Sequence, residues 1–226
     1  MQLVREKWIM KDVWVQKLLV ALFVILPLQL NIHGQTNSME RVLNQRAVSF
    51  AVKDTTLNLA LQRVAREFDL AVGFESLPDS EAQPNINVNI EDGTLRDVLN
   101  SIIANDKRYF WTPFGQTIDV SPLASDSLIK TIIPHYEIQR LNRRKAVDVL
   151  VNAPEIQSEL QRRHIRRREF SNFYDSTNSL KTVSLDLKQA TVREILNAIA
   201  EASHSRFWTF HIYGKQNEYF SVRVSQ

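Results

Sequence analysis

The side chains best suited to chemistry are the cations of one short segment. Residues 162–168 read RRHIRRR, and the candidate contact residues are Arg162, Arg163, His164, Arg166, Arg167 and Arg168. One interpretation is a solvated helix end, because cations suit the negative end of a helix dipole. The other is contact with an anion: a lipid headgroup, lipopolysaccharide, a glycan or an acidic partner surface. Nucleic acid, the usual guess for such a run, is not expected of an exported chain.

Residues for catalysis or metal binding do not gather in the sequence. The histidines at 135, 164, 204 and 211 lack metal-ligand spacing such as His-x-x-x-His. There is no cysteine, and with only five glycines there is neither a phosphate loop nor a nucleophile elbow. No pair of carboxylates stands out as an acid–base couple. We therefore expect a protein that is not an enzyme and that needs no cofactor and no metal.

A repeated unit organises the chain around these residues. Residues 85–121 read NINVNIEDGTLRDVLNSIIANDKRYFWTPFGQTIDVS. Alternating apolar residues from Ile86 to Ile90 predict a strand. Apolar residues at i, i+3, i+4 and i+7 from Leu95 onward predict a helix, with Thr94 and Asp97 as a capping box. Residues 109–112 and 117–120 then predict two further strands.

The same unit recurs twice. Residues 185–224 repeat it, with Thr191 for Thr94 and Trp208 for Trp111 at a constant offset of 97 residues. A fainter copy, capped by Thr56, lies at residues 48–74. We infer that one strand–helix–strand unit was used at least three times. The two tryptophans, at equivalent strand positions, are expected in the core.

These repeats resemble a known family, the secretin and TonB N-terminal short domain. The segments VNIEDGTLRDVLNSII and LDLKQATVREILNAIA carry the resemblance. It implies small periplasmic α+β modules, of the kind found at the front of outer-membrane secretins, in signalling TonB-dependent receptors and in some sigma-regulator proteins. The motif contains no catalytic residue. The resemblance therefore implies a non-catalytic protein–protein interaction module, accessory to such a transport or signalling system, with an envelope protein of one of these types as its partner.

The expected fold class is α+β, with two small domains in which helices pack on short mixed β-sheets built from βαβ-type repeats. With 226 residues, 44% of them hydrophobic, the chain can bury a real core. Residues 35–122 form the first predicted domain, and the linker-like SPLASDS follows at 121–127. Residues 123–226 form the second. It starts with a strand at 128–133 and a helix capped by Asn142, and it has diverged or contains a basic helical insertion that begins with Pro154.

The first 34 residues are expected to lie outside the fold. Four cations, at positions 5, 7, 11 and 17, precede an apolar run at residues 18–28. This is the pattern of a secretory signal, which we expect to end near Gly34. The alternative is an uncleaved anchor that holds the protein on the periplasmic face of the inner membrane, with membrane contact through this segment. Either way the expected location is the periplasm of a Gram-negative-type bacterium.

Charge suggests a second function. Residues 35–226 carry 24 basic and 23 acidic side chains, but residues 140–168 carry nine basic and three acidic ones. The positive charge is thus local. The alternative function is binding of an anionic envelope component through the segment from Arg162 to Arg168. Such binding should weaken steeply between low and physiological salt, which separates it from an interaction module.

The last two predicted strands offer a docking edge. Residues 207–213 and 218–224 are rich in β-branched and aromatic side chains and end the chain, where no later element can cover them. Free sheet edges accept strands from other proteins. We expect this hairpin to hold a partner strand, with the candidate edge residues Tyr219, Ser221, Val222 and Arg223.

Overall fold

The computed structural model describes residues 38–78, 83–167, 181–214, 216 and 218–225. The chain divides into two compact units, Met1–Leu43 and Asn44–Gln226. In the first unit, residues 38–43 are helical. Among the described residues, no helix has the length and apolar character needed to span a membrane. The predicted leader, residues 1–34, lies outside the described residues.

The first half of the larger unit follows the predicted order. Its elements are β1 (Arg46–Thr55), α2 (Leu57–Glu67), β2 (Ala71–Ser76), β3 (Ile86–Thr94), α3 (Leu95–Ala104), β4 (Tyr109–Phe114) and β5 (Thr117–Pro122). The predicted capping box at α3 is confirmed. The Asp97 N–H donates to Thr94 Oγ1 at 3.1 Å, and the Thr94 N–H donates to Asp97 Oδ2 at 2.8 Å.

The second half contains a 3-10 turn, three helices and five strands among the residues described. They are η1 (Leu128–Lys130), β6 (Ile132–Leu141), α4 (Arg143–Val151), α5 (Pro154–Arg162), β7 (Arg166–Arg167), β8 (Val183–Thr191), α6 (Val192–Ala202), β9 (Phe207–Tyr213) and β10 (Tyr219–Ser225). The strand predicted at 128–133 is largely wrong, because the chain turns there before β6 begins. Asn142 caps α4 as predicted, since its side chain accepts from the Lys145 N–H at 2.9 Å. Pro154 lies in the first turn of α5, also as predicted.

A backbone feature recurs in both halves of the larger unit. Four non-glycine residues adopt a left-handed conformation two positions before a helix N-cap: Asp54, Asp92, Arg140 and Gln189, with φ between 48° and 55°. Side chains other than glycine rarely adopt this conformation, so its recurrence marks one strand-to-helix junction used four times. The junction before Asn142 is 86 residues after the one before Thr56. The offset between corresponding junctions rises from 86 to 97 residues, and helix α5, which has no counterpart between α2 and β2, lies in the intervening chain.

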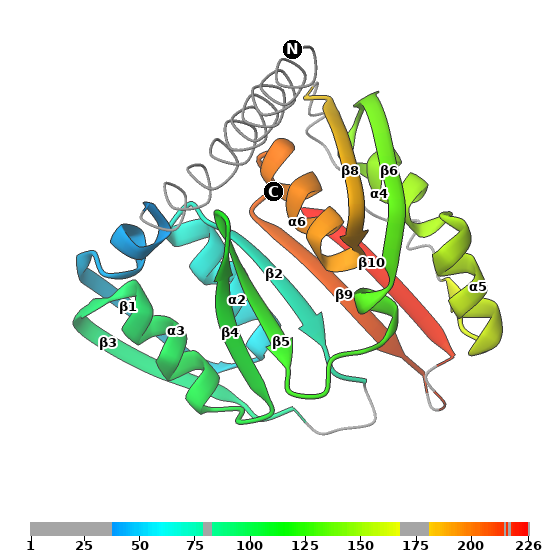
Figure 1. The fold of residues 1–226 in the computed structure, drawn as a ribbon. Helices are drawn as coiled ribbons and strands as arrows, with labels where there is room; N and C mark the ends of the chain where they lie inside the picture. The colour runs from blue at the N-terminus through cyan, green and yellow to red at the C-terminus, as the bar shows by residue number, and fades with distance from the viewer. Residues whose placement is uncertain (1–37, 79–82, 168–180, 215, 217, 226) are drawn as a thin grey trace, which may run out of the picture. The chain divides into compact units, whose positions relative to one another are not determined.

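The strands form one central sheet and two outer ribbons. Six described strands make up the sheet, in the order β4-β5-β2-β9-β10-β7. β2 lies between β5 and β9 and is parallel to both (Figure 1). β1 with β3, and β6 with β8, form separate antiparallel ribbons.

The α+β class is confirmed, but the two predicted segments do not have separate sheets. β2 of the first segment pairs with β9 of the second, from Val72 opposite Phe207 to Ser76 opposite His211. The physical reason is that β2 is buried along its length, so its backbone N–H and C=O groups need strands on both edges. The SPLASDS segment therefore connects the two halves of one compact unit. We call the half from β1 to β5 the first repeat and the half from η1 to β10 the second repeat.

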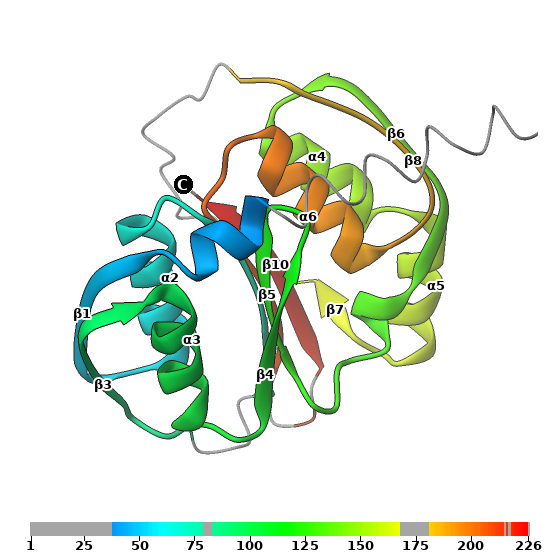
Figure 2. The same cartoon turned by 60° about the vertical axis from the view of Figure 1, so that its left-hand side comes forward.

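The two repeats place their helices on opposite faces of the sheet. α2 and α3 lie on one side, and α4 and α6 lie on the other (Figure 2). Alternate residues of a strand face opposite sides of the sheet, so the side chains of β2 pack against both repeats. Phe74 faces the first repeat and its ring lies 5.5 Å from that of Tyr109, measured between centroids. Gly73 faces the second repeat, directly beneath the indole of Trp208.

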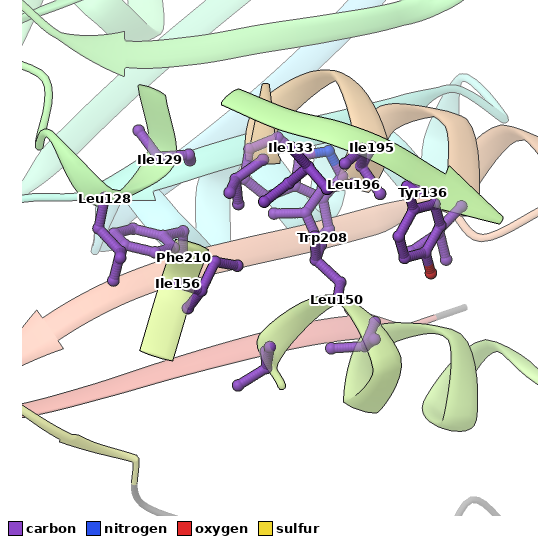
Figure 3. Packing of buried hydrophobic residues seen from close by; sticks show 14 of the residues in the cluster. Leu128, Ile129, Ile133, Tyr136, Leu150, Ile156, Ile195, Leu196, Trp208 and Phe210 are labelled. Atoms are coloured by element: carbon purple, nitrogen blue, oxygen red, sulfur yellow. The ribbon is translucent and has the colours of Figure 1, made fainter. Parts of the chain in front are cut away.

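The core of the second repeat surrounds Trp208, which is fully buried among residues of α4, α6 and β6 (Figure 3). Ile133, Leu150 and Leu196 belong to this cluster. The predicted helix phase is confirmed in both repeats, because the equivalent residues Leu99 and Leu196 are fully buried.

Candidate functional site

Half of the six candidate residues in the arginine-rich segment form ion pairs within the chain. Arg162 donates to Glu159, with Nη2 2.6 Å from Oε1. Arg163 binds both carboxylate oxygens of Asp126, at 2.5 and 2.9 Å, and Arg167 forms an ion pair with Asp148. The hydrogen bonds from Arg162 lower the pKa of Glu159 to about 2. Three of the predicted contact residues thus already have carboxylate partners.

The other residues of the segment are spread over different elements. His164 takes a left-handed conformation just after α5, with φ 56°. Arg166 begins β7 and is exposed, and Arg168 lies outside the described residues. An open groove of about 450 Å³ runs past His164, Arg166 and Arg167. Arg162 is 68% exposed, so its ion pair with Glu159 is one that a ligand can replace at little cost.

The predicted docking edge at β10 is partly covered. β7 pairs in parallel with the start of β10, with Tyr219 opposite Arg166, and the Arg166 N–H donates to the Glu218 carbonyl at 2.7 Å. The expectation of an uncovered edge is therefore wrong at Tyr219, because an earlier strand returns to this edge. Among the described residues, no strand pairs with the outer side of Ser221, Val222 and Arg223.

The joint between the two repeats contains a buried acidic side chain, Glu75. It is 1% exposed and accepts hydrogen bonds from the Arg193 guanidinium, from Ser125 Oγ and from the Asp126 N–H, the last at 2.6 Å. Burial raises the pKa of Glu75, and these donors and the charge of Arg193 oppose that effect. The ion pair connects β2 of one repeat to α6 of the other.

A second polar chain crosses the same joint. Trp208 Nε1 donates to Asn197 Oδ1 at 2.7 Å, and Asn197 Nδ2 donates to Asp119 Oδ2 at 3.0 Å. Burial raises the pKa of Asp119 to about 6. Asp119 Oδ1 and Arg193 Nη1 are buried without a hydrogen-bond partner in the described part of the chain. We call Arg193, Asn197 and Trp208 the covered trio.

The first repeat has the same three side chains in an open setting. Trp111 Nε1 donates to Asn100 Oδ1 at 2.9 Å, and the Arg96 guanidinium lies 5.5 Å above the Trp111 ring. The corresponding distance from Arg193 to the Trp208 ring is 5.9 Å. Arg96, Asn100 and Trp111, each 97 residues before its counterpart, are called the open trio. Asn100 is exposed, and Arg96 and Trp111 are half-buried.

Sequence reasoning did not find these trios, although the signal was present. Arginine and asparagine are identical in TLRDVLN and TVREILN, whereas the exposed Asp97 corresponds to Glu194. The two asparagines occupy the same repeat position, yet Asn100 is exposed and Asn197 is buried. The expectation that both tryptophans lie in the core is confirmed for Trp208 and is only partly correct for Trp111.

Within the described residues, no group of three or more histidine or acidic side chains is placed to hold a metal ion. Comparison with protein-family models, with curated proteins and with solved structures finds no match to this chain. The resemblance to the secretin and TonB N-terminal short domain therefore rests on the quoted segments alone.

Proposed function

We propose that this chain is a non-catalytic protein–protein interaction module, exported to the periplasm and accessory to a secretin or TonB-type transport or signalling system. The observation that carries the proposal is the outer edge of β4. β4 is the first strand of the sheet, and among the described residues no strand pairs with its outer side. β4 carries Phe110 and Phe114, which are 41% and 44% accessible, as well as Trp111 of the open trio.

An exposed strand edge flanked by aromatic side chains is a typical protein-binding surface, because the backbone supplies hydrogen bonds and the side chains supply apolar contact. The resemblance of the repeats to periplasmic modules supports the envelope location, and the apolar leader supports export.

Photo-crosslinking in intact cells tests this function. A photo-reactive residue is placed at Thr112 on β4, at Val222 on β10 or at Leu59, an exposed residue of α2 that serves as the control position. We expect an envelope protein to be captured from one of the two strand positions and not from Leu59. Recovery of the protein in the osmotic-shock fraction tests export. Absence of specific adducts from both strands would refute the proposal.

The alternative function, binding of an anionic envelope component, is favoured only by the groove beside His164, Arg166 and Arg167. Arg163 and Arg167 already form ion pairs, so a ligand would have to displace Asp126 or Asp148 to bind them. Binding to anionic vesicles or lipopolysaccharide that falls steeply with salt and is abolished by Arg166→Gln would support this alternative.

A further inference from the structure

The joint between the two repeats consists of the β2–β9 ladder and the buried polar side chains around it. In the described part of the chain this is the one strand ladder that connects the repeats, and it runs from Val72 opposite Phe207 to Ser76 opposite His211 (Figure 1). The other strand pairs of the sheet each lie within one repeat. A change that loosens this ladder therefore acts on the contact between the repeats and leaves the pairing inside each repeat in place.

Two acidic side chains and one cation meet at the joint. Glu75 of β2 is 1% exposed and Asp119 of β5 is 4% exposed. Arg193 of α6 forms an ion pair with Glu75, and its charge also acts on Asp119. If both carboxylates are ionised, two negative charges face one positive charge. An uncompensated charge in a buried place is unfavourable, because water does not solvate it there.

The elements packed around Asp119 bring no further compensating charge to it. β4 places Thr112 opposite Asp119, and β2 places Gly73 opposite it on the other side. α6 supplies Arg193 and also Asn197, whose Nδ2 donates to Asp119 Oδ2 at 3.0 Å. Within the described residues, Arg193 is thus the cation that acts on Asp119.

A second ion pair lies beside the joint but is balanced in itself. Asp126 follows β5, and its backbone N–H donates to Glu75 at 2.6 Å. Its own carboxylate binds Arg163 of α5 through both oxygens, at 2.5 and 2.9 Å. This pair contributes one charge of each sign, so the excess negative charge belongs to Glu75 and Asp119.

The two carboxylates differ in how well their ionised forms are bound. Glu75 accepts three hydrogen bonds, one of them from Arg193. Asp119 accepts from Asn197, and its Oδ1 is buried without a partner in the part of the chain that is described. Hydrogen bonds to a carboxylate favour the ionised form, and burial without them favours the protonated form. Asp119 is therefore the group that takes up a proton, and burial raises its pKa to about 6.

Proton binding at Asp119 is linked to the state of the joint. A carboxylate of aspartate that is exposed to water has a pKa of about 4. The closed joint therefore holds the proton more tightly than an opened joint does. The equilibrium constant for opening should rise about a hundredfold as the pH rises from about 4 to about 6, and then level off. Burial also raises the pKa of Glu75, so its ionisation acts in the same direction.

We propose that the joint is a proton-controlled contact between the repeats, which stays closed while Asp119 carries a proton and opens more readily when Asp119 is ionised. Opening frees one edge of β2 and one edge of β9, and free strand edges accept strands of other proteins. This inference goes beyond the proposed interaction function and does not depend on it, because it concerns a contact inside the chain.

Amide hydrogen exchange in the full chain, at a series of pH values, measures the opening. The Val72 N–H donates to the Arg206 carbonyl at 2.8 Å and reports the β2–β9 ladder. Ser121, opposite Phe110 in the β4–β5 ladder, reports pairing within the first repeat. Because exchange is itself catalysed by base, each measured rate is converted to a protection factor, the intrinsic rate at that pH divided by the measured rate.

Asp119→Asn is the principal variant, because asparagine keeps an oxygen to accept from Asn197 and does not ionise. The protection factor of Val72 in the wild type, divided by that in Asp119→Asn, should fall about a hundredfold from about pH 4 to about pH 7.5. The same ratio for Ser121 should stay constant. Asp148→Asn is the matched control, since it makes the same chemical change at a carboxylate of α4 that pairs with Arg167. It should show the pH dependence of the wild type.

Two exchange results would overturn the inference. One is a ratio for Val72 that does not change with pH. The other is an equal fall at Ser121, which would mean that the whole unit unfolds and that the joint does not open by itself.

A carbon-13 NMR titration of the Asp119 carboxyl group gives a second readout that needs no variant. A midpoint near about 6 is expected, and one near about 4 would also overturn the inference. Capture of a partner from Thr112 tests the interaction function separately, so the two proposals can fail independently.

Discussion

Alanine in place of Asn197 and of Asn100 tests whether Asn197 is a buried link between the two repeats. Each asparagine accepts a hydrogen bond from the indole of its tryptophan, at 2.7 Å for Trp208 and 2.9 Å for Trp111. The two substitutions therefore remove the same side chain from the same position of the repeat. The sites differ in two respects: Asn197 is buried while Asn100 is exposed, and Asn197 also donates to Asp119.

The magnitudes follow from what each substitution leaves behind. Asn197→Ala leaves two buried groups unpaired, the donor Trp208 Nε1 and the acceptor Asp119 Oδ2. At about 1–3 kcal/mol for each orphaned group, the free energy of unfolding should fall by about 2–6 kcal/mol. Asn100→Ala leaves Trp111 Nε1 within reach of water, so the loss should stay near about 0.5 kcal/mol.

Urea unfolding followed by tryptophan fluorescence and by far-UV circular dichroism measures both values. Coincident transitions by the two probes are needed before the free energies are compared. Arg63→Gln on α2 serves as a surface control. Equal losses for the two asparagine variants, or a loss below about 1 kcal/mol for Asn197→Ala, would refute the assignment of Asn197 as a buried link between the repeats.

Three further predictions concern the joint and the core. Gly73→Ala should lower the free energy of unfolding by about 1–3 kcal/mol, because the new Cβ would lie 2.3 Å from an indole that has no room to move; an unchanged urea midpoint would contradict this packing. Leu99→Ala should cost about 2–5 kcal/mol as a core truncation, and a thermal midpoint shifted no more than by Asn100→Ala would show that the helix phase is wrong. Burial raises the pKa of Asp119 to about 6, so the folded protein binds a proton at this carboxylate more tightly than the unfolded chain does. The contribution of Asp119 to the free energy of unfolding therefore falls as the pH rises from about 4 to about 6. The asparagine of Asp119→Asn does not ionise, so the free energy of unfolding of this variant relative to the wild type should increase by about 3 kcal/mol between pH 4 and pH 7.5. A difference that does not change with pH would argue against a buried ionisable Asp119.

Local features of the fold were predictable because they depend on residues close together in the chain. The capping boxes of α3 and α6 join residues three positions apart, Thr94 with Asp97 and Thr191 with Glu194. The apolar stripes of these helices repeat at the helical period, and they identified Leu99 and Leu196 as core residues. The copy at β6 and α4 was harder to recognise, because α5 lies between α4 and β7 and changes the offset from 97 to 86 residues.

The outcome for the arginine-rich segment shows where sequence reasoning reaches its limit. Its charge was evident, but Asp126 and Asp148, which pair with Arg163 and Arg167, lie 37 and 19 residues away. Whether a cation is solvated, paired or open to a ligand depends on which distant carboxylates the fold brings within a few ångströms. That distance is a property of the tertiary structure.

The sequence by itself determined the repeated strand–helix units, their caps, the buried face of each helix and the α+β class. Only the tertiary structure decided that β2 joins the two repeats into one sheet. It also decided that Arg193, Asn197 and Trp208 are covered while the same three residue types, Arg96, Asn100 and Trp111, remain accessible. The reason is physical: caps and helix phase come from neighbours along the chain, whereas burial depends on which strand lies alongside, and two similar sequence patterns can have different neighbours in space.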